Sequence, residues 1–391
     1  MTSQSVLLRA DGIFDPRART VHVPGFVVVT GSTIRYAGSS PPPGAVRATT
    51  VELPGLYLMP GLIDTHVHLC FDPAADDCVG LLEAQDDREL LVAMTGRARR
   101  AARGGVTTIR DLGDRSYLAV QLAATGDGEI PTILAAGPPL TSPGGHCHYL
   151  GGEVSSVGQA LDAVAEHCAR GSDLIKIMVT GGILTSSSDP GQMQFGQDTV
   201  RVVVTAAHAR GRRVAAHAHT REGIELALRC GADTIEHATF ASEADFHYDA
   251  RVAAAIAASA AWVCPTFVAR PGVSWQPEHF SWRGSVLARL HRASVRLAGG
   301  TDAGVKQGLD HASAGWIMSS YVALGVPLLD ALVAVTYGAA QACGVAHRKG
   351  LLAPGWDADV IAVRGNPLLD PLATTEPALV MNRGSVLAEP A

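Results

Sequence analysis

The chain has 391 residues, of which 47% are hydrophobic and 17% are charged. Lys and Arg number 31 against 37 Asp and Glu, a formal net charge of −6, so we expect neither nucleic acid nor a membrane as a partner. The apolar content excludes a disordered chain, and 7 scattered cysteines without a Cys-x-x-Cys pair favour a soluble, cytoplasmic protein over a disulfide scaffold.

Residues 1–57 show the pattern of short strands separated by Gly and Pro turns. The segments SVLLRA, RTVHVPGFVVVTG and STIRYAG are β-prone runs between such breakers. Residues 346–391 return to this pattern in GLLAPGWDADVIAVRG and ALVMNRGSVL. The two ends of the chain are therefore expected to share one small sheet.

Residues 58–345 alternate apolar, β-branched runs with longer segments of helical period, which is typical of a parallel sheet with crossover helices. Eight strands are predicted, at 58–66, 106–112, 131–137, 173–179, 213–217, 233–237, 262–267 and 296–302. Helices are predicted between them at 85–103, 157–170, 198–211, 222–230 and 249–260. This α/β pattern matches a (β/α)8 TIM barrel, a fold of typically about 250 residues.

Residues able to bind metal recur at the carboxyl ends of the predicted strands. They are His66, His68, His217, His237 and Asp302. Active sites of TIM barrels lie at this end because the βα loops converge there. His66 and His68 are two positions apart, so on a strand both face the same side and can share one divalent ion.

Lys176 lies within the apolar strand DLIKIMV and is expected to point into the barrel. A buried ammonium is costly, and a nearby metal ion would repel it. A neutral lysine can add carbon dioxide to form a carbamate, which could bridge two metal ions. The alternative is a neutral or ion-paired lysine beside a single metal ion.

Five segments resemble the amidohydrolase superfamily and occur in the required order: MPGLIDTHVHL, IKIMVTGG, VAAHAHT, TIEHATF and GGTDAG. The sequence is most similar to the imidazolonepropionase-like and Xaa-Pro or Xaa-Arg/Lys dipeptidase branch. The resemblance implies a barrel flanked by a β-sandwich made from both termini. It also implies two divalent ions of the zinc type, whose ligands are His66, His68 and Asp302 for the first, His217 and His237 for the second, and a carboxylated Lys176 between them.

The fifth predicted strand leaves its metal ligand open. His217 and His219 fall on the same side of a strand, and His219-x-x-Glu222 is similar to the His-x-x-Glu of mononuclear deaminases. Periodicity cannot choose between the two histidines. The resemblance to the dipeptidase branch favours His217 as the ligand and His219 as a substrate contact.

Further substrate contacts are expected in the loops at the same end of the barrel. His146, in SPGGHCHYL, could stabilise a developing oxyanion, and Arg221 or Arg270 could hold a carboxylate. His148 and His311 are further candidates in these loops. The segment ARPGVSWQPEHFSW is expected to be a loop whose residues Trp275, Phe280 and Trp282 form a substrate wall or pack on the barrel helices.

The resemblance implies hydrolysis of an amide or peptide bond in a short peptide or N-acyl amino acid by a metal-bound hydroxide. Asp302 would act first as general base and then as general acid. Some relatives process bottromycin-type peptide natural products, and the aromatic segment is compatible with such a substrate. The alternatives are a mononuclear cyclic-amide hydrolase or deaminase and a non-catalytic binding protein. A homo-oligomer is compatible with the sequence.

Overall fold

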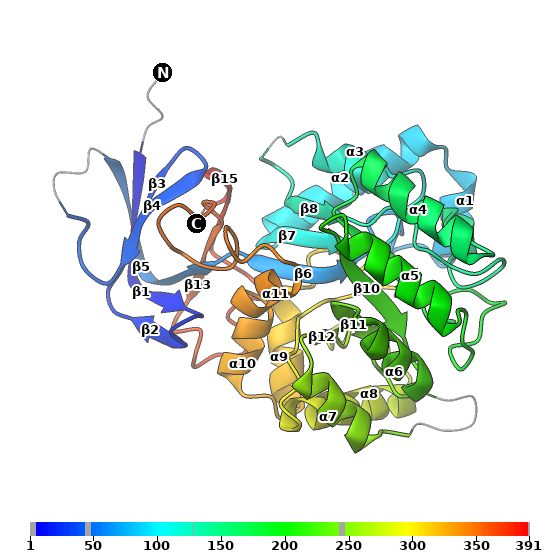
Figure 1. Cartoon of the computed structure of the whole chain (residues 1–391). Helices are drawn as coiled ribbons and strands as arrows, with labels where there is room; N and C mark the ends of the chain where they lie inside the picture. Colours follow the sequence, from blue (N-terminus) through cyan, green and yellow to red (C-terminus); the bar gives the residue numbers. More distant parts are fainter. Residues whose placement is uncertain (1–4, 44–47, 127, 242–246, 390–391) are drawn as a thin grey trace.

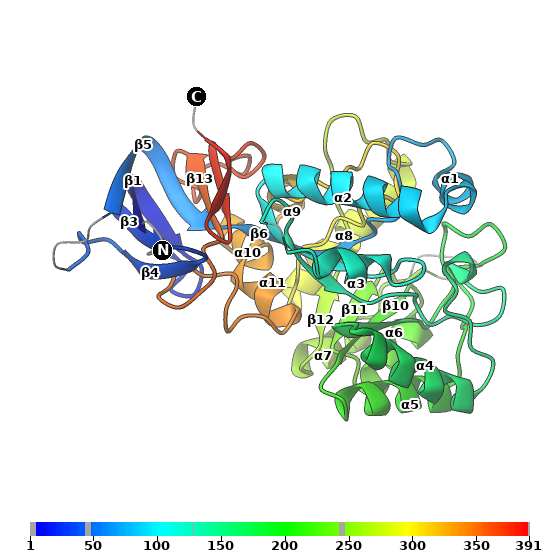
Figure 2. The same cartoon turned by 90° about the horizontal axis from the view of Figure 1, so that it is seen from above.

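The computed structural model describes residues 5–43, 48–126, 128–241 and 247–389. Figure 1 shows two parts, a large sheet built from both ends of the chain and an α/β part that contains most of the helices. The helices α10 (Leu328–Ala334) and α11 (Tyr337–Ala342) lie next to the sheet in both views (Figures 1 and 2). An ion pair between Arg19 and Asp330 joins the turn after the first strand to α10.

The sheet has eight strands in the order β15-β14-β13-β5-β1-β3-β4, with β2 paired to β1. Their bounds are β1 Ser5–Asp15, β2 Thr20–His22, β3 Gly25–Thr30, β4 Thr33–Gly38, β5 Ala48–Pro60, β13 Val360–Arg364, β14 Leu379–Asn382 and β15 Ser385–Ala388. The antiparallel pairing of β5 with β13 joins the two ends of the chain. This is the sheet that was expected from the two ends of the chain, with more strands than a small sheet has. Its arrangement as a sandwich stays a prediction.

The α/β part contains two parallel sheets. One has the order β6-β7-β8 and the other β12-β11-β10-β9. Their bounds are β6 Leu62–Val67, β7 Val106–Asp111, β8 Thr132–Ala135, β9 Leu174–Met178, β10 Arg213–Ala218, β11 Thr234–His237 and β12 Trp262–Cys264. Single parallel bridges join Leu140 to Ile177, Val263 to Leu297 and Val67 to Ala303. These bridges lie where the predicted barrel would close.

Two of the predicted strands differ from the structure. The strand predicted at 58–66 divides at Gly61, because residues up to Pro60 pair with β13 and only Leu62 onward joins the parallel sheet. A Cβ atom on Gly61 would lie 2.2 Å from Thr107 Oγ1, so the close approach at this division requires glycine. The segment predicted as the eighth strand, 296–302, contains one isolated bridge, at Leu297, and a second lies directly after it at Ala303.

The other helices are α1 Cys78–Ala84, α2 Asp87–Arg103, α3 Leu118–Ala123, α4 Val157–Arg170, α5 Gln197–His208, α6 Arg221–Cys230, α7 Ala250–Ala258, α8 Pro277–Arg292 and α9 Gly315–Ala323, with a short 3-10 turn at His148–Leu150. The helix predicted at 157–170 has the bounds of α4. The prediction of a loop for the aromatic segment 269–282 was wrong in its second half, where α8 begins at Pro277. Within the described ranges, no helix combines the length and the apolar character needed to cross a membrane.

Apolar residues explain why the strands of the α/β part lie inside it. All five residues of β9 are buried, including those on both faces of the strand. Near-continuous apolar runs of this kind are expected where a parallel sheet is covered on both faces. The charged side chains in these strands are therefore exceptions that need a partner or a function.

Candidate active site

Eight of the residues predicted from the sequence as ligands or substrate contacts line one cavity of about 630 Å³. They are His66, His68, His146, Lys176, His217, His219, His237 and Asp302. They come from β6, β9, β10 and β11 and from the segments that follow the strands. The strand ends thus bring together residues up to 236 positions apart in the sequence (66 to 302).

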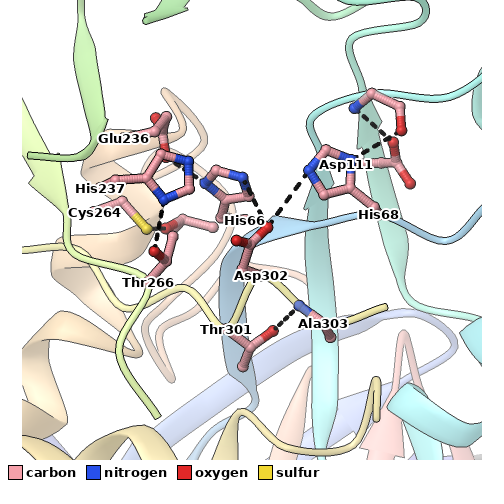
Figure 3. A network of polar contacts seen from close by, with 12 residues as sticks. His66, His68, Asp111, Glu236, His237, Cys264, Thr266, Thr301, Asp302 and Ala303 are labelled. Carbon is pink, nitrogen blue, oxygen red and sulfur yellow. Dashed lines mark hydrogen bonds and ion pairs between the residues drawn. The ribbon is translucent and has the colours of Figure 1, made fainter. Parts of the chain in front are cut away.

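His66 and His68 both turn Nε2 toward Asp302, as Figure 3 shows. The Nε2 atoms lie 3.4 Å and 3.6 Å from Asp302 Oδ1. Nδ1 of His68 donates to the carbonyl oxygen of Gly113 at 3.0 Å, which leaves Nε2 as the nitrogen with a free lone pair. Burial lowers the pKa of both imidazoles to about 4, so both rings are neutral near pH 7 and can bind a cation.

Glu236 orients His66 from behind. Its carboxylate accepts from His66 Nδ1 at 2.8 Å and from Arg110 Nη2 at 2.9 Å, and all three side chains are buried. Burial opposes ionisation of Glu236, but the charge of Arg110 and the hydrogen bond from His66 hold its pKa well below the usual range. An ionised Glu236 keeps the proton of His66 on Nδ1 and aims Nε2 into the cavity.

A second group of histidines lies beside the first. The rings of His217, His219 and His237 are buried, and one nitrogen of each lies within 4.8 Å of the others. His217 Nε2 donates to the carbonyl oxygen of Gly181 at 2.9 Å, which leaves Nδ1 with a free lone pair. His237 Nδ1 is 2.8 Å from Thr266 Oγ1, as seen in Figure 3. Burial is the largest cause that lowers the pKa of all three imidazoles.

The donors around the cavity fit divalent metal ions. Nitrogen and oxygen atoms of His66, His237 and Asp302 also lie within 4.8 Å of one another. Lys176 Nζ is buried and has no hydrogen-bond partner among the described residues, and burial lowers its pKa. His146 Nδ1 is likewise buried without a partner in that part of the chain. Neutral imidazoles, one carboxylate and an unpartnered amine form a set of ligands suited to a cation such as Zn²⁺.

Other candidates from the sequence lie outside the cavity wall. The side chain of Arg221 is 43% exposed and pairs with Glu222, and Arg270 pairs with Asp310. His148 bonds to the carbonyl oxygen of Gly145. The buried His311 has Nε2 3.0 Å from the carbonyl oxygen of His68, so it supports the main chain of a proposed ligand from behind.

Several residues of the site were not anticipated from the sequence. Glu236 and Arg110 are charged residues inside strands that are buried throughout, and a charge within a predicted inner strand was a signal that each needs a buried partner. Arg283 and Lys306 also line the cavity. Arg283 follows directly after the segment predicted as a loop, and neither its helix α8 nor a role for Lys306 was predicted from the sequence.

A model of the amidohydrolase family matches residues 57–387. The chain belongs to the amidohydrolase family. This membership identifies it as a hydrolase that acts on amide bonds, in a family that generally uses divalent metal ions.

Comparison with individual proteins shows which members of the family this chain resembles. The amidohydrolase is 28% identical to ochratoxinase of Aspergillus niger over 402 residues, covering 90% of this chain and 80% of that protein. It superposes with a TM-score of 0.87 on an Xaa-Pro dipeptidase with bound methionine in its active site, at 26% identity over 98% of this chain and 99% of the other. A prolidase complexed with N-methylphosphonate-L-proline gives 0.85 at 25% identity, over 99% and 100%. The likeness to the dipeptidase branch is confirmed, and the likeness to bottromycin-type enzymes stays a prediction.

Proposed function

We propose that this amidohydrolase uses divalent metal ions to hydrolyse the amide bond of a short peptide or an N-acyl amino acid, inside an eight-stranded barrel. The observation that carries the proposal is the buried Lys176 Nζ, which lacks a hydrogen-bond partner within the described ranges and shares a cavity with seven histidines and Asp302. An ammonium in this position would be destabilised by burial. A lysine converted to an anionic ligand would remove that cost.

In the proposed centre, His66, His68 and Asp302 hold one ion, and His217 and His237 hold a second. The neutral amine of Lys176 attacks carbon dioxide and loses a proton, which yields an anionic carbamate with two oxygen ligands. Zn²⁺ is the proposed ion because neutral imidazole and anionic oxygen are among its usual ligands.

The choice of His217 over His219 rests on their hydrogen bonds. A carbonyl oxygen can only accept, so the contact with Gly181 fixes the proton of His217 on Nε2 and frees Nδ1. His219 Nδ1 instead contacts the hydroxyl of Thr239 at 2.9 Å, a group that can donate or accept. The free lone pair of His217 supports its role as a ligand, and His219 is left to contact the substrate.

The metal ions would lower the pKa of a water molecule to about 7 and polarise the amide carbonyl. Asp302 accepts the proton of the attacking water and delivers it to the departing nitrogen. His146 is kept neutral because burial lowers its pKa to about 3, and its imidazole N–H can donate to the oxygen of the tetrahedral intermediate. The product amine and carboxylic acid then leave the cavity.

Two observations favour amide hydrolysis over deamination. The relatives include an Xaa-Pro dipeptidase and a prolidase, names that describe the cleavage of peptides. Glu222, which would move protons in a mononuclear deaminase, has a side chain that is 57% exposed and paired with Arg221. It does not line the cavity in which His219 lies.

The test is the metal content of the wild-type protein and of Lys176→Ala, measured by elemental analysis together with turnover of dipeptides and N-acyl amino acids. We expect about two ions per wild-type chain. In Lys176→Ala the metal content should fall and turnover should fall by at least about 100-fold, since a bridging ligand is lost. Lys306→Arg, which keeps a charge elsewhere in the cavity, is the control and should retain both ions.

A single ion per chain that persists in Lys176→Ala would refute the carbamate bridge and favour the mononuclear cyclic-amide hydrolase or deaminase. If added short carboxylic acids restored metal binding in Lys176→Ala, the result would support the proposal that the variant has lost an anionic ligand.

A further inference from the structure

Two cations and one indole form a part of the cavity wall that the proposed mechanism does not use. Arg283, from α8, and Lys306, from the segment after Asp302, both line the cavity. The Lys306 ammonium lies 4.5 Å and the Arg283 guanidinium carbon 5.1 Å from the centre of the Trp275 ring. The two positive groups therefore approach the same indole.

Neither cation is neutralised by a carboxylate. Among the described residues neither forms an ion pair, and Asp302 is the one carboxylate that lines the cavity. Arg283 Nη2 donates to the carbonyl oxygens of Pro265 and Thr266 at 2.8 Å and 2.7 Å and to Thr266 Oγ1 at 2.6 Å, while its Nε has no partner in the described part of the chain. These hydrogen bonds of Arg283 thus go to neutral acceptors, and a bound anion would balance its charge.

The electrostatics agree with an anion site. Burial, and then the charge of Arg283, lower the pKa of Lys306. Burial also lowers the pKa of Arg283, and Asp302 is the largest influence in the opposite direction. Two cations that repel each other in a partly desolvated cavity are stabilised when a negative ligand enters.

Another part of the cavity wall is apolar. Ile183, Leu184 and Pro190, from the segment between β9 and α5, line the cavity together with Phe71. Ile183 is 71% exposed, so this apolar part of the wall reaches the protein surface. His146, proposed to face the carbonyl oxygen, contacts this wall, since a Cβ on Gly182 would lie 2.4 Å from its Nε2.

We propose that Arg283 and Lys306 bind the free carboxylate of the amino acid that hydrolysis releases, and that the apolar wall binds the acyl group. The substrates are then N-acyl amino acids with an apolar acyl group, an inference that rests on the function proposed above. Asp302, proposed to protonate the departing nitrogen, precedes Lys306 by four positions and is the largest influence that raises the pKa of Arg283, so the carboxylate belongs to the amine half of the substrate.

The test uses the metal-loaded enzyme and paired compounds, in which each N-acyl amino acid is compared with its C-terminal carboxamide. The wild type should prefer the acid by about 10- to 100-fold in kcat/KM, the range expected for hydrogen bonds to a charged group. Lys306→Met should lower kcat/KM for the acid by about tenfold or more, mainly through KM, and should leave the carboxamide nearly unchanged. Lys306→Arg, which keeps a positive charge at this position, should retain the wild-type preference for the acid.

Arg289→Met is the matched control, because Arg289 lies on α8 but is exposed and outside the cavity wall. It should leave the preference for the acid unchanged. If Lys306→Met fails to fold, inhibition of the wild type by free amino acids and by their amides decides the point, with the free acids expected to bind more tightly. An octanoyl acyl group should also be preferred to an acetyl group in kcat/KM, by about fourfold for each CH₂ that the apolar wall fully buries.

The outcomes separate the two proposals. Equal hydrolysis of acid and carboxamide by the wild type, or an unchanged preference in Lys306→Met, would overturn the carboxylate site and leave the amide hydrolase standing. Hydrolysis of neither compound by the metal-loaded wild type would overturn the proposed function and the carboxylate site with it.

Discussion

Hydrogen bonds to fixed acceptors decide which nitrogen each histidine presents to the cavity. His68 donates to a carbonyl oxygen, and His66 donates to a carboxylate that Arg110 keeps ionised. Partners of this kind determine the tautomer and the direction of a ligand, so they contribute to metal affinity without touching the ion. Glu236 is therefore expected to be a positioning residue.

Replacing Glu236 with Gln should weaken metal binding by about 10- to 100-fold. The amide can present a donor to His66, which then loses the acceptor that holds its proton on Nδ1, and Arg110 loses its buried counter-charge. Competition with a chelator measures the metal affinity. Glu166→Gln, at a side chain on α4 that is 56% exposed, is the control and should bind metal like the wild type. Equal affinity in Glu236→Gln would show that His66 needs no carboxylate behind it.

At the scale of elements, helix α8 shows where local sequence signals fail. Its interior contains Gly284, which is unfavourable in a helix by about 1 kcal/mol relative to Ala. The structure explains this residue, since a Cβ there would lie 2.5 Å from Leu324 Cδ2. Close packing against the end of α9 thus selects a residue that weakens the helical signal, and Arg283 reaches the cavity because the helix forms.

The segment between β9 and α5 gives a prediction at the same scale. Gly182→Ala should lower kcat by about tenfold or more, because the added Cβ would lie 2.4 Å from His146 Nε2 and must displace that ring. Steady-state kinetics and a thermal unfolding midpoint close to that of the wild type would separate displacement from misfolding. Gly196→Ala adds a Cβ into open space and serves as the control. Unaltered kcat in Gly182→Ala would remove His146 from the proposed mechanism.

At the scale of the whole molecule, one buried lysine joins the two parts. Lys349 Nζ donates to Thr132 Oγ1 at the start of β8 and to Asp359 Oδ2 beside β13, at 2.7 Å and 2.6 Å. It also lies 2.8 Å from Asp357 Oδ2. Burial opposes the ionisation of Asp357, but the charge of Lys349 and its hydrogen bond bring the pKa of that carboxyl below its usual value.

Lys349→Met should lower the free energy of unfolding by about 3 kcal/mol at pH 7, because it leaves carboxylates without their buried counter-charge. A depressed pKa in the folded state means that the ion pair stabilises above a pH of about 4 and is lost as the pH falls through the folded pKa. The difference between wild type and variant should therefore shrink toward pH 3. Denaturant titrations at several pH values measure it.

Arg348→Met removes the other, 49% exposed cation that contacts Asp357 and provides the control. Its effect should stay below about 1 kcal/mol, as for exposed ion pairs. A loss in Lys349→Met that is independent of pH would contradict the electrostatic link between the two parts.

The sequence by itself determined the local features of this amidohydrolase. The alternation of apolar runs and helical segments placed most strands and α4, and the strand-end positions of His66, His68, His217, His237 and Asp302 predicted residues that the structure brings to one cavity. These predictions succeeded because side-chain periodicity and the convergence of parallel strand ends follow from backbone geometry.

Only the tertiary structure decided how the elements meet. The pairing of β5 with β13, the partners of Glu236, and the meeting of Arg283 and Lys306 at Trp275 join residues far apart in the chain. Spacing along a sequence carries no signal for such contacts, because they depend on how whole elements pack. For the same reason the sequence pointed to Arg221 and Arg270 as candidates for carboxylate binding, whereas packing brings Arg283 and Lys306 to the cavity.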